Sequence, residues 1–280
     1  MSRTYDIPKT RLRLSRKSST RTPFPVVTVV AVVALVSLIP FAYLLVVSLL
    51  PVSPGGAVGG LWQELFASQS VARYMANSAI VSISSTVLVI FLSCLAGFGF
   101  AKLSYRGSGI AYALVVAAIS VPSVSIILPN FLNLARLGGI DSYWAPIVLY
   151  TVGSVPVATI LTTSYFRSLP DEVVESAVLD GASYWRVFTS VMVPMALPAM
   201  VTVGVLSFLG AWNDLLIGLL FFPDPALRTI TVGVAALEGA HVSSINLALT
   251  GSLLSALPPL VVFVLFQRHL VSGITAGALR

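Results

Sequence analysis

The side chains in this sequence that could do chemistry are few and scattered. The chain has one cysteine, Cys94, and two histidines, His241 and His269. A Ser-His-Asp relay or a zinc site needs such side chains to converge, and the topology predicted below puts the histidines on opposite sides of a membrane. The sequence contains no Gly-x-x-x-x-Gly-Lys-Ser/Thr loop for nucleotide phosphates and no His-Glu-x-x-His pair. We therefore expect a chain without enzyme activity, metal site or bound cofactor.

The densest group of polar and aromatic residues lies in segment 167–194, which holds four of the ten acidic residues. Pro170 followed by Asp171 and Glu172 predicts a helix start, because proline suits the first turn and carboxylates favour the positive end of the helix dipole. We expect this helix to end near Leu179.

A turn and a second helix are expected to follow within the same segment. Gly181 permits a turn that other residues resist, and Ser183 is a suitable N-cap. Apolar residues then recur with helical spacing in two adjacent stripes, which consist of Trp185, Phe188 and Met192, and of Tyr184, Val187 and Val191. Such a broad apolar face marks a contact surface. It packs either on other parts of this chain or on a separate soluble protein.

The composition requires that much of the chain lies in a membrane. Of the 280 residues, 57% are hydrophobic and 9% are charged, whereas about a quarter are charged in soluble domains. Hydrocarbon must therefore cover part of the surface. We predict an all-α integral membrane protein with six spans, each long enough to cross about 30 Å. The predicted spans are residues 25–50, 77–101, 110–130, 142–166, 195–215 and 247–266.

The basic residues predict the orientation of these spans. With the N-terminus in the cytoplasm, 13 of the 16 basic residues fall on the inside, as the positive-inside rule favours. Both termini are then cytoplasmic. Seven of these residues lie within the first 21 positions, so residues 1–24 are predicted to form a basic cytoplasmic arm ahead of the membrane domain, residues 25–280. The arm has no aromatic residue except Tyr5, which argues against a nucleic-acid partner.

Segment 167–194 also resembles a known family. The residues Glu175-Ser176-Ala177, Asp180-Gly181-Ala182, Phe188, Val193-Pro194 and Pro198 resemble the EAA loop of the membrane subunits of bacterial ATP-binding-cassette (ABC) importers. Ser176 stands where the family usually has alanine. Further stretches resemble the second permease of maltose-type carbohydrate importers, namely Asn77-Ser78, residues 97–107, Trp212-Asn213-Asp214 and residues 267–280, although the family usually ends in Lys-Gly and this chain in Arg280.

The resemblance implies the ABC importer permease fold in the bacterial cytoplasmic membrane. It implies four kinds of partner: a second permease, two copies of a cytoplasmic ATP-binding subunit that binds ATP and Mg, an extracytoplasmic solute-binding protein, and membrane lipid. The EAA loop would be the coupling segment that docks on the ATPase. The residues expected to serve coupling are Glu172, Glu175, Ala177, Asp180, Gly181, Ala182, Tyr184, Trp185, Phe188 and Pro194.

A solute path is the second expected site. Asp214 and Asn213 lie beside Trp212 near a membrane boundary, and an acid at such a position suggests function. The alternative is an anchor at the outer interface. Tyr150 and Asn77 are weaker candidates for the same path. The resemblance favours a sugar or polyol as solute, with glycerophosphate-type compounds as an alternative.

Two rival functions remain at this point. A secondary transporter or channel would need no ATPase, but the sequence lacks the paired intramembrane charges that ion coupling uses. A membrane enzyme is disfavoured by the scattered chemistry described above.

Overall fold

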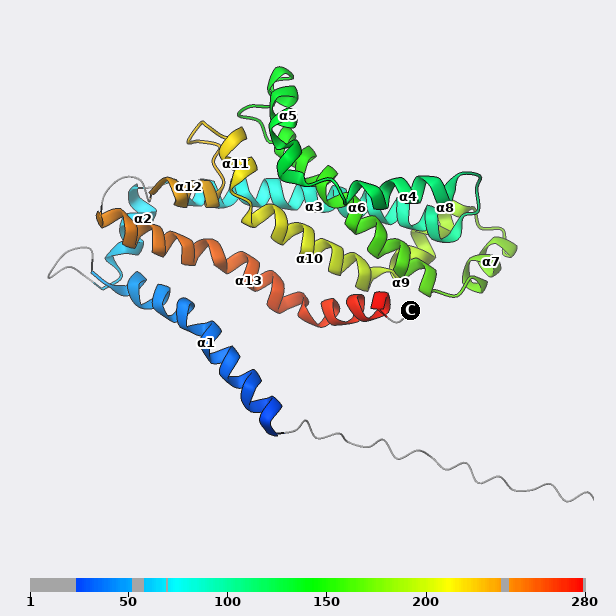
Figure 1. Ribbon diagram of the computed structural model, residues 1–280, viewed down its shortest axis with the longest axis horizontal. Coiled ribbons are helices and arrows are strands. Elements are labelled where there is room, and N and C mark those ends of the chain that lie inside the picture. The colour runs from blue at the N-terminus through cyan, green and yellow to red at the C-terminus, as the bar shows by residue number, and fades with distance from the viewer. Residues whose placement is uncertain (1–23, 52–57, 69, 238–241, 279–280) are drawn as a thin grey trace, which may run out of the picture. The chain divides into compact units, whose positions relative to one another are not determined.

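The computed structural model describes four stretches of the chain. They are residues 24–51, 58–68, 70–237 and 242–278. Every regular element within these stretches is a helix (Figure 1). The chain divides into two compact units, residues 1–43 and 44–280. The predicted basic arm lies outside the described residues except for its last position, and so does His241.

Helix α1, Phe24–Leu49, matches the first predicted span. Its 26 residues contain Pro40 but no charged side chain, and at about 1.5 Å per residue they reach about 39 Å. The side chains from Val26 to Tyr43 are all exposed. A helix that is apolar on every side suits a lipid environment.

The second unit is built around a pair of long helices, α3 (Val71–Lys102) and α6 (Trp144–Ser168). The Thr162 hydroxyl of α6 donates a hydrogen bond of 2.7 Å to the Ser93 carbonyl of α3. A Cβ on Gly97 would lie 2.4 Å from the Thr162 hydroxyl. Glycine and a small hydroxyl side chain therefore let the two backbones approach closely, as is common between membrane helices.

The third predicted span, residues 110–130, is wrong as a single helix. The structure divides it into α4 (Ser108–Ala118) and α5 (Ser123–Arg136), which meet at 95°. The break ends at Pro122. Proline has no amide hydrogen, and it disfavours helical conformation in the residue before it, so the helix does not continue through this point.

The remaining spans lie on α10 (Leu197–Asn213) and α13 (Val242–Ala278), the latter with Pro258 and Pro259 inside it. Within the described residues, four single helices are long and apolar enough to cross a membrane. Two bent pairs add two more if each counts as one span. The second such pair joins Tyr184–Met195 to α10 at 75°. The predicted number of six spans is reached only if each bent pair is counted as one span.

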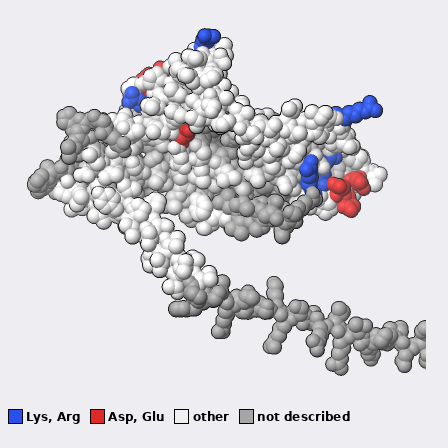
Figure 2. All heavy atoms as spheres, in the orientation of Figure 1, with Lys and Arg blue, Asp and Glu red and all other residues white. Residues whose placement is uncertain are grey.

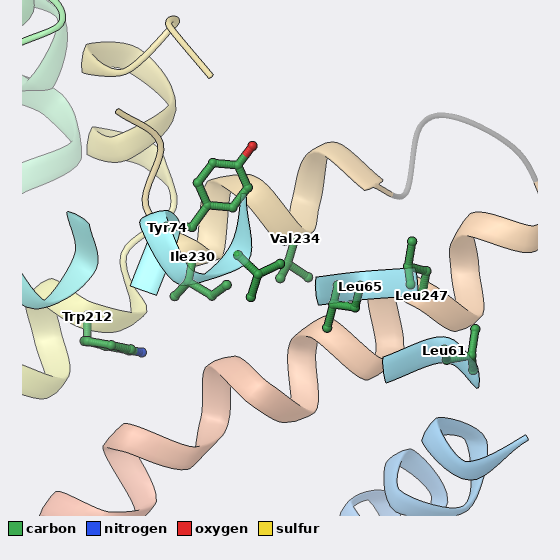
Figure 3. Close-up of a cluster of buried hydrophobic side chains, with 8 residues drawn as sticks. Leu61, Leu65, Tyr74, Trp212, Ile230, Val234 and Leu247 are labelled. Atoms are coloured by element: carbon green, nitrogen blue, oxygen red, sulfur yellow. The ribbon is translucent and has the colours of Figure 1, made fainter. Parts of the chain in front are cut away.

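A core cluster closes one end of the second unit. Side chains from five helices gather in it (Figure 3): α3, α10 and α13 together with α2 (Gly60–Ser68) and α12 (Ile230–Leu237). Leu65 and Ile230 are completely buried there. The short helix α11, Leu216–Phe221, lies between α10 and α12 in the chain. Segment 167–194 begins in the last turn of α6 and leads into α10.

Candidate functional site

The first predicted helix of segment 167–194 is confirmed. Helix α7 runs over Glu172–Leu179, with Asp171 as its N-cap and two acids in the first turn. The carbonyl of Asp171 accepts the amide of Val174 at 2.9 Å. The local signals that start a helix therefore act here as expected.

The turn at Gly181 is a Schellman motif, the commonest way to end a helix on glycine. Gly181 has φ = 84°, and its amide donates to the Val178 carbonyl at 3.0 Å. The amide of Ala182 donates to the Ala177 carbonyl, also at 3.0 Å. These two bonds satisfy the last carbonyls of the helix. The half-buried methyl groups of Ala177 and Ala182 pack against the neighbouring core.

The second helix starts where expected but then changes its geometry. Ser183 is the N-cap of α8, Tyr184–Val187, and its hydroxyl accepts the amide of Arg186 at 3.3 Å. A π-helical stretch, η1, follows over Phe188–Met192, and α9 covers Val193–Met195. The wider π turn departs from the regular α-helical spacing on which the two apolar stripes were predicted.

The apolar residues of this second helix divide between core and surface. Val187, Phe188 and Met192 are buried with Cys94 and Phe98 of α3 and Phe166 of α6. Phe188 is only 5% exposed, and its ring centroid lies 5.2 Å from that of Phe98. In this structure Phe188 is covered by its own chain, and its contact with a partner stays a prediction. Tyr184 and Trp185 remain exposed, Trp185 at 60%.

An acidic–aromatic surface results at this end of the unit. Leu179 is 87% exposed, and the carboxylates of Glu172, Glu175 and Asp180 form no hydrogen bond or ion pair with the other described residues. Figure 2 shows acidic side chains gathered over α7, with basic side chains directly beside them, on a face that is otherwise largely uncharged. Pro194 is also exposed. We define the acidic–aromatic surface as Glu172, Glu175, Leu179, Asp180, Tyr184 and Trp185.

Lys102 is a residue of this site that the sequence analysis missed. Its Nζ donates to the Leu169 carbonyl at 2.6 Å and to Asp171 Oδ1 at 2.5 Å. In the sequence Lys102 stands out only as one of the basic residues on the predicted inside and as part of the family-like stretch 97–107. A signal was present in the sequence. Lys102 follows the predicted span 77–101, and Asp171 starts a predicted helix on the same side of the membrane. In a chain with so few charges, two opposite charges on one side are candidates for an ion pair.

Asn77 lies at the other end of α3 and binds its own chain. Its Nδ2 donates to the carbonyls of Ala226 at 3.0 Å and Arg228 at 2.9 Å. Its Oδ1 accepts the Tyr143 hydroxyl at 2.7 Å. With both ends of the amide engaged and the residue buried, Asn77 holds the loop before α12 in place. This geometry favours a structural role over a place on the solute path.

Tyr150 and Asp214 meet, as a common path would require. The Tyr150 hydroxyl donates to Asp214 Oδ1 at 2.9 Å, and the Ile217 amide donates to the same oxygen at 2.8 Å. The Thr231 hydroxyl donates to the Asp214 carbonyl at 3.0 Å. Asp214 thus joins α6, α11 and α12.

Trp212 and Asn213 point to different places although they are adjacent. Trp212 is buried in the core cluster, and its Nε1 donates to the Ser255 carbonyl of α13 at 3.0 Å. Asn213 is exposed and lines a hollow of about 400 Å³ together with Thr231, Ser252 and Ser255. The five predicted path residues therefore do not converge: Tyr150 pairs with Asp214, and of the five only Asn213 lines this partly polar hollow.

Comparison with known proteins identifies the family. Residues 90–276 match the family described as binding-protein-dependent transport system inner membrane component. Over 219 residues the chain is 32% identical to the sulfoquinovosyl glycerol transport system permease protein SmoH of Agrobacterium fabrum, covering 78% of this chain and 77% of that protein. Over 208 residues it is 30% identical to the trehalose/maltose transport system permease protein MalG of Thermococcus litoralis, covering 74% and 75%.

A solved structure shows the same fold. It is the crystal structure of a bacterial ABC transporter involved in the import of the acidic polysaccharide alginate, with a TM-score of 0.75 at 19% identity. The match covers 88% of this chain and 95% of that one. The resemblance carried by residues 175–198 is thus confirmed, and the chain belongs to the family of inner membrane permease components of binding-protein-dependent ABC transport systems.

Proposed function

We propose that this permease imports a sugar or a related polyol. It would work with a second permease, two copies of an ATPase subunit that carries ATP and Mg, and an extracytoplasmic solute-binding protein. Support comes from relatives whose names specify carbohydrate solutes: sulfoquinovosyl glycerol, trehalose or maltose, and, in a protein of Streptomyces coelicolor that is 32% identical over 216 residues, diacetylchitobiose. The chain itself would be non-catalytic, with ATP hydrolysis left to the ATPase.

The acidic–aromatic surface is the observation that carries the proposal. Leu179 and Trp185 expose apolar side chains. They lie beside the three carboxylates of the same surface, which have no partner among the described residues. Burying one such side chain fully stabilises a contact by roughly 1.5–3 kcal/mol, and exposed aromatic residues are frequent hot spots. We assign this surface to the ATPase, with Glu175 and Asp180 making polar contacts at the docking site. Segment 167–194, a part of the domain of residues 25–280, then lies in the cytoplasm. The basic arm of residues 1–24 is predicted to lie there as well.

Transport follows from two states of one assembly. ATP binding draws the two ATPase subunits together and moves segment 167–194 with them. Since the nucleotide binds the two states with different free energies, it shifts their populations. The membrane helices then open the path outward to receive solute, and hydrolysis returns them. Asn213 and the hydroxyl groups around its hollow would offer hydrogen bonds to a polyhydroxylated solute.

The proposal is tested by purifying the tagged chain from its native membranes and assaying ATP hydrolysis in the eluate. The unmodified chain should elute with an ATPase and a second permease. The double variant Tyr184→Ala/Trp185→Ala should lose most of the ATPase while the second permease is retained. Trp144→Ala is the matched control, because Trp144 is an exposed tryptophan at the start of α6, away from this surface. An unmodified chain that elutes without ATPase in detergents of several kinds refutes the proposal.

A further inference from the structure

Lys102 connects the ends of three helices through one ammonium group. It is the last residue of α3, it binds the carbonyl of Leu169, which caps the end of α6, and it binds the carboxylate of Asp171, which caps the start of α7. A cation at the ends of α3 and α6 lies where both helix dipoles are negative. Segment 167–194 is therefore attached to α3 by side-chain contacts, in addition to its backbone connections to α6 and α10.

The two partners of this ion pair differ sharply in burial. The side chain of Lys102 is 2% exposed and that of Asp171 is 77% exposed. A buried ammonium that loses its partners must regain water, so its position depends strongly on these two bonds. Water screens so exposed a carboxylate, so the charge attraction itself adds little to stability. The two bonds still fix where the buried ammonium lies, which gives Lys102 a positioning role beside whatever it contributes to the fold.

Helix α3 is suited to carry movement from this joint to its other end. It is a single helix of 32 residues with no proline, which makes it about 48 Å long. That exceeds the hydrocarbon thickness of about 30 Å. Close packing at Gly97 and the hydrogen bond from Thr162 to Ser93 hold it to α6 along the way.

The far end of α3 is tied to another loop. Asn77 binds two carbonyls of the loop 222–229, as described above. The next residue, Ser78, accepts the amide of Ile230 at 2.8 Å, at the first residue of α12. One continuous helix is therefore anchored at one end to segment 167–194 and at the other to the loop that precedes α12.

We propose that Lys102 is the positioning residue that transmits displacement of segment 167–194 to α3, and through α3 to loop 222–229. This inference rests on the proposed function, because the displacement is the one that the ATPase would cause. Without the ammonium, the segment would still dock on the ATPase through the acidic–aromatic surface. Its movement would reach α3 less completely, so that ATP would be hydrolysed with less transport.

The test compares solute uptake with ATP hydrolysis in proteoliposomes that contain the complete transporter and its binding protein. In Lys102→Met, which keeps most of the length of the side chain but removes the charge and both hydrogen bonds, the ratio of uptake to hydrolysis should fall at least roughly tenfold, the factor that corresponds to one lost charge-assisted hydrogen bond. Lys102→Arg keeps charge and donors and should retain most of the ratio. Arg106→Met is the matched control, since Arg106 is an exposed cation four residues further on that forms no bond with the other described residues.

A second variant keeps the test decisive if Lys102→Met fails to assemble. Asp171→Asn changes only an exposed carboxylate and should lower the same ratio by a smaller factor. The double variant Lys102→Met/Asp171→Asn should be no worse than Lys102→Met alone, because both changes break one joint. A ratio unchanged in both single variants, or lowered equally in Arg106→Met, overturns the inference. Failure of the proposed function would look different, because the unmodified complex would then contain no ATPase.

Discussion

Replacing Gly181 with valine isolates the contribution of one turn to coupling. Gly181 adopts φ = 84°, and a Cβ added there would meet no atom within 4 Å. The added Cβ therefore causes no clash in the chain itself. The expected effect comes from the backbone conformation, which valine resists and glycine adopts freely.

The magnitude follows from that conformation. A residue with a Cβ in the left-handed region costs roughly 1–2 kcal/mol, which corresponds to about a 5- to 30-fold shift toward other turn conformations. Any such conformation breaks the bonds from Gly181 to Val178 and from Ala182 to Ala177. The direction of α8 relative to α7 then changes, and with it the spacing between Leu179 and Trp185 on the acidic–aromatic surface.

The assay measures uptake, ATP hydrolysis and the amount of chain inserted in the membrane. We expect Gly181→Val to insert normally, to lose uptake at least severalfold, and to retain ATP hydrolysis in the ATPase that remains bound. Gly138→Val is the matched control. Gly138 has φ = 74° and open space for a Cβ, and it ends α5 with the same pair of bonds, from Gly138 to Ala135 and from Gly139 to Leu134.

Two results would refute the reasoning. Uptake at the unmodified level in Gly181→Val would show that this turn has no role in coupling. Equal loss of uptake in both glycine variants would show that strain anywhere in the chain, and not the geometry of this turn, causes the defect.

Three further predictions concern the membrane helices. Gly97→Ala should destabilise the purified chain by about 1–3 kcal/mol through overpacking, seen as a lower melting temperature, whereas Gly99→Ala should not lower it because a Cβ there meets nothing within 4 Å. Asp214→Ala should lower the melting temperature by leaving the Tyr150 hydroxyl unpaired, a cost of roughly 1–3 kcal/mol, and Asp214→Asn, which keeps an acceptor, should lower it less. Asn213→Ala should reduce uptake while melting and ATP hydrolysis stay unchanged, and full uptake would exclude its hollow from the solute path.

Local signals were sufficient to predict the first half of segment 167–194. Pro170 and Asp171 start α7, Gly181 ends it and Ser183 caps the next helix, because each of these preferences acts through neighbours in the chain. The long apolar runs likewise predicted most of the membrane helices.

Features that depend on distant residues were not predictable in the same way. Phe188 and Trp185 have similar character in the sequence, yet only the Phe188 ring meets Phe98 of α3. The two carbonyls that Asn77 binds lie about 150 positions further along the chain, and its third partner, Tyr143, lies 66 positions away. Lys102 pairs with a residue 69 positions away, and only the folded arrangement of α3 and α6 brings the two together.

The hydrogen bond from Trp212 to Ser255 has a consequence for α13. In a regular helix the carbonyl of Ser255 would accept the amide of the residue four positions later, but that residue is Pro259, which has no amide hydrogen. The indole of Trp212 supplies the missing donor from α10. Trp212 and Pro259 are therefore complementary here. Loss of the indole leaves the Ser255 carbonyl without its hydrogen-bond donor. Replacement of the proline gives the same carbonyl a backbone amide as a second donor, which then competes with the indole.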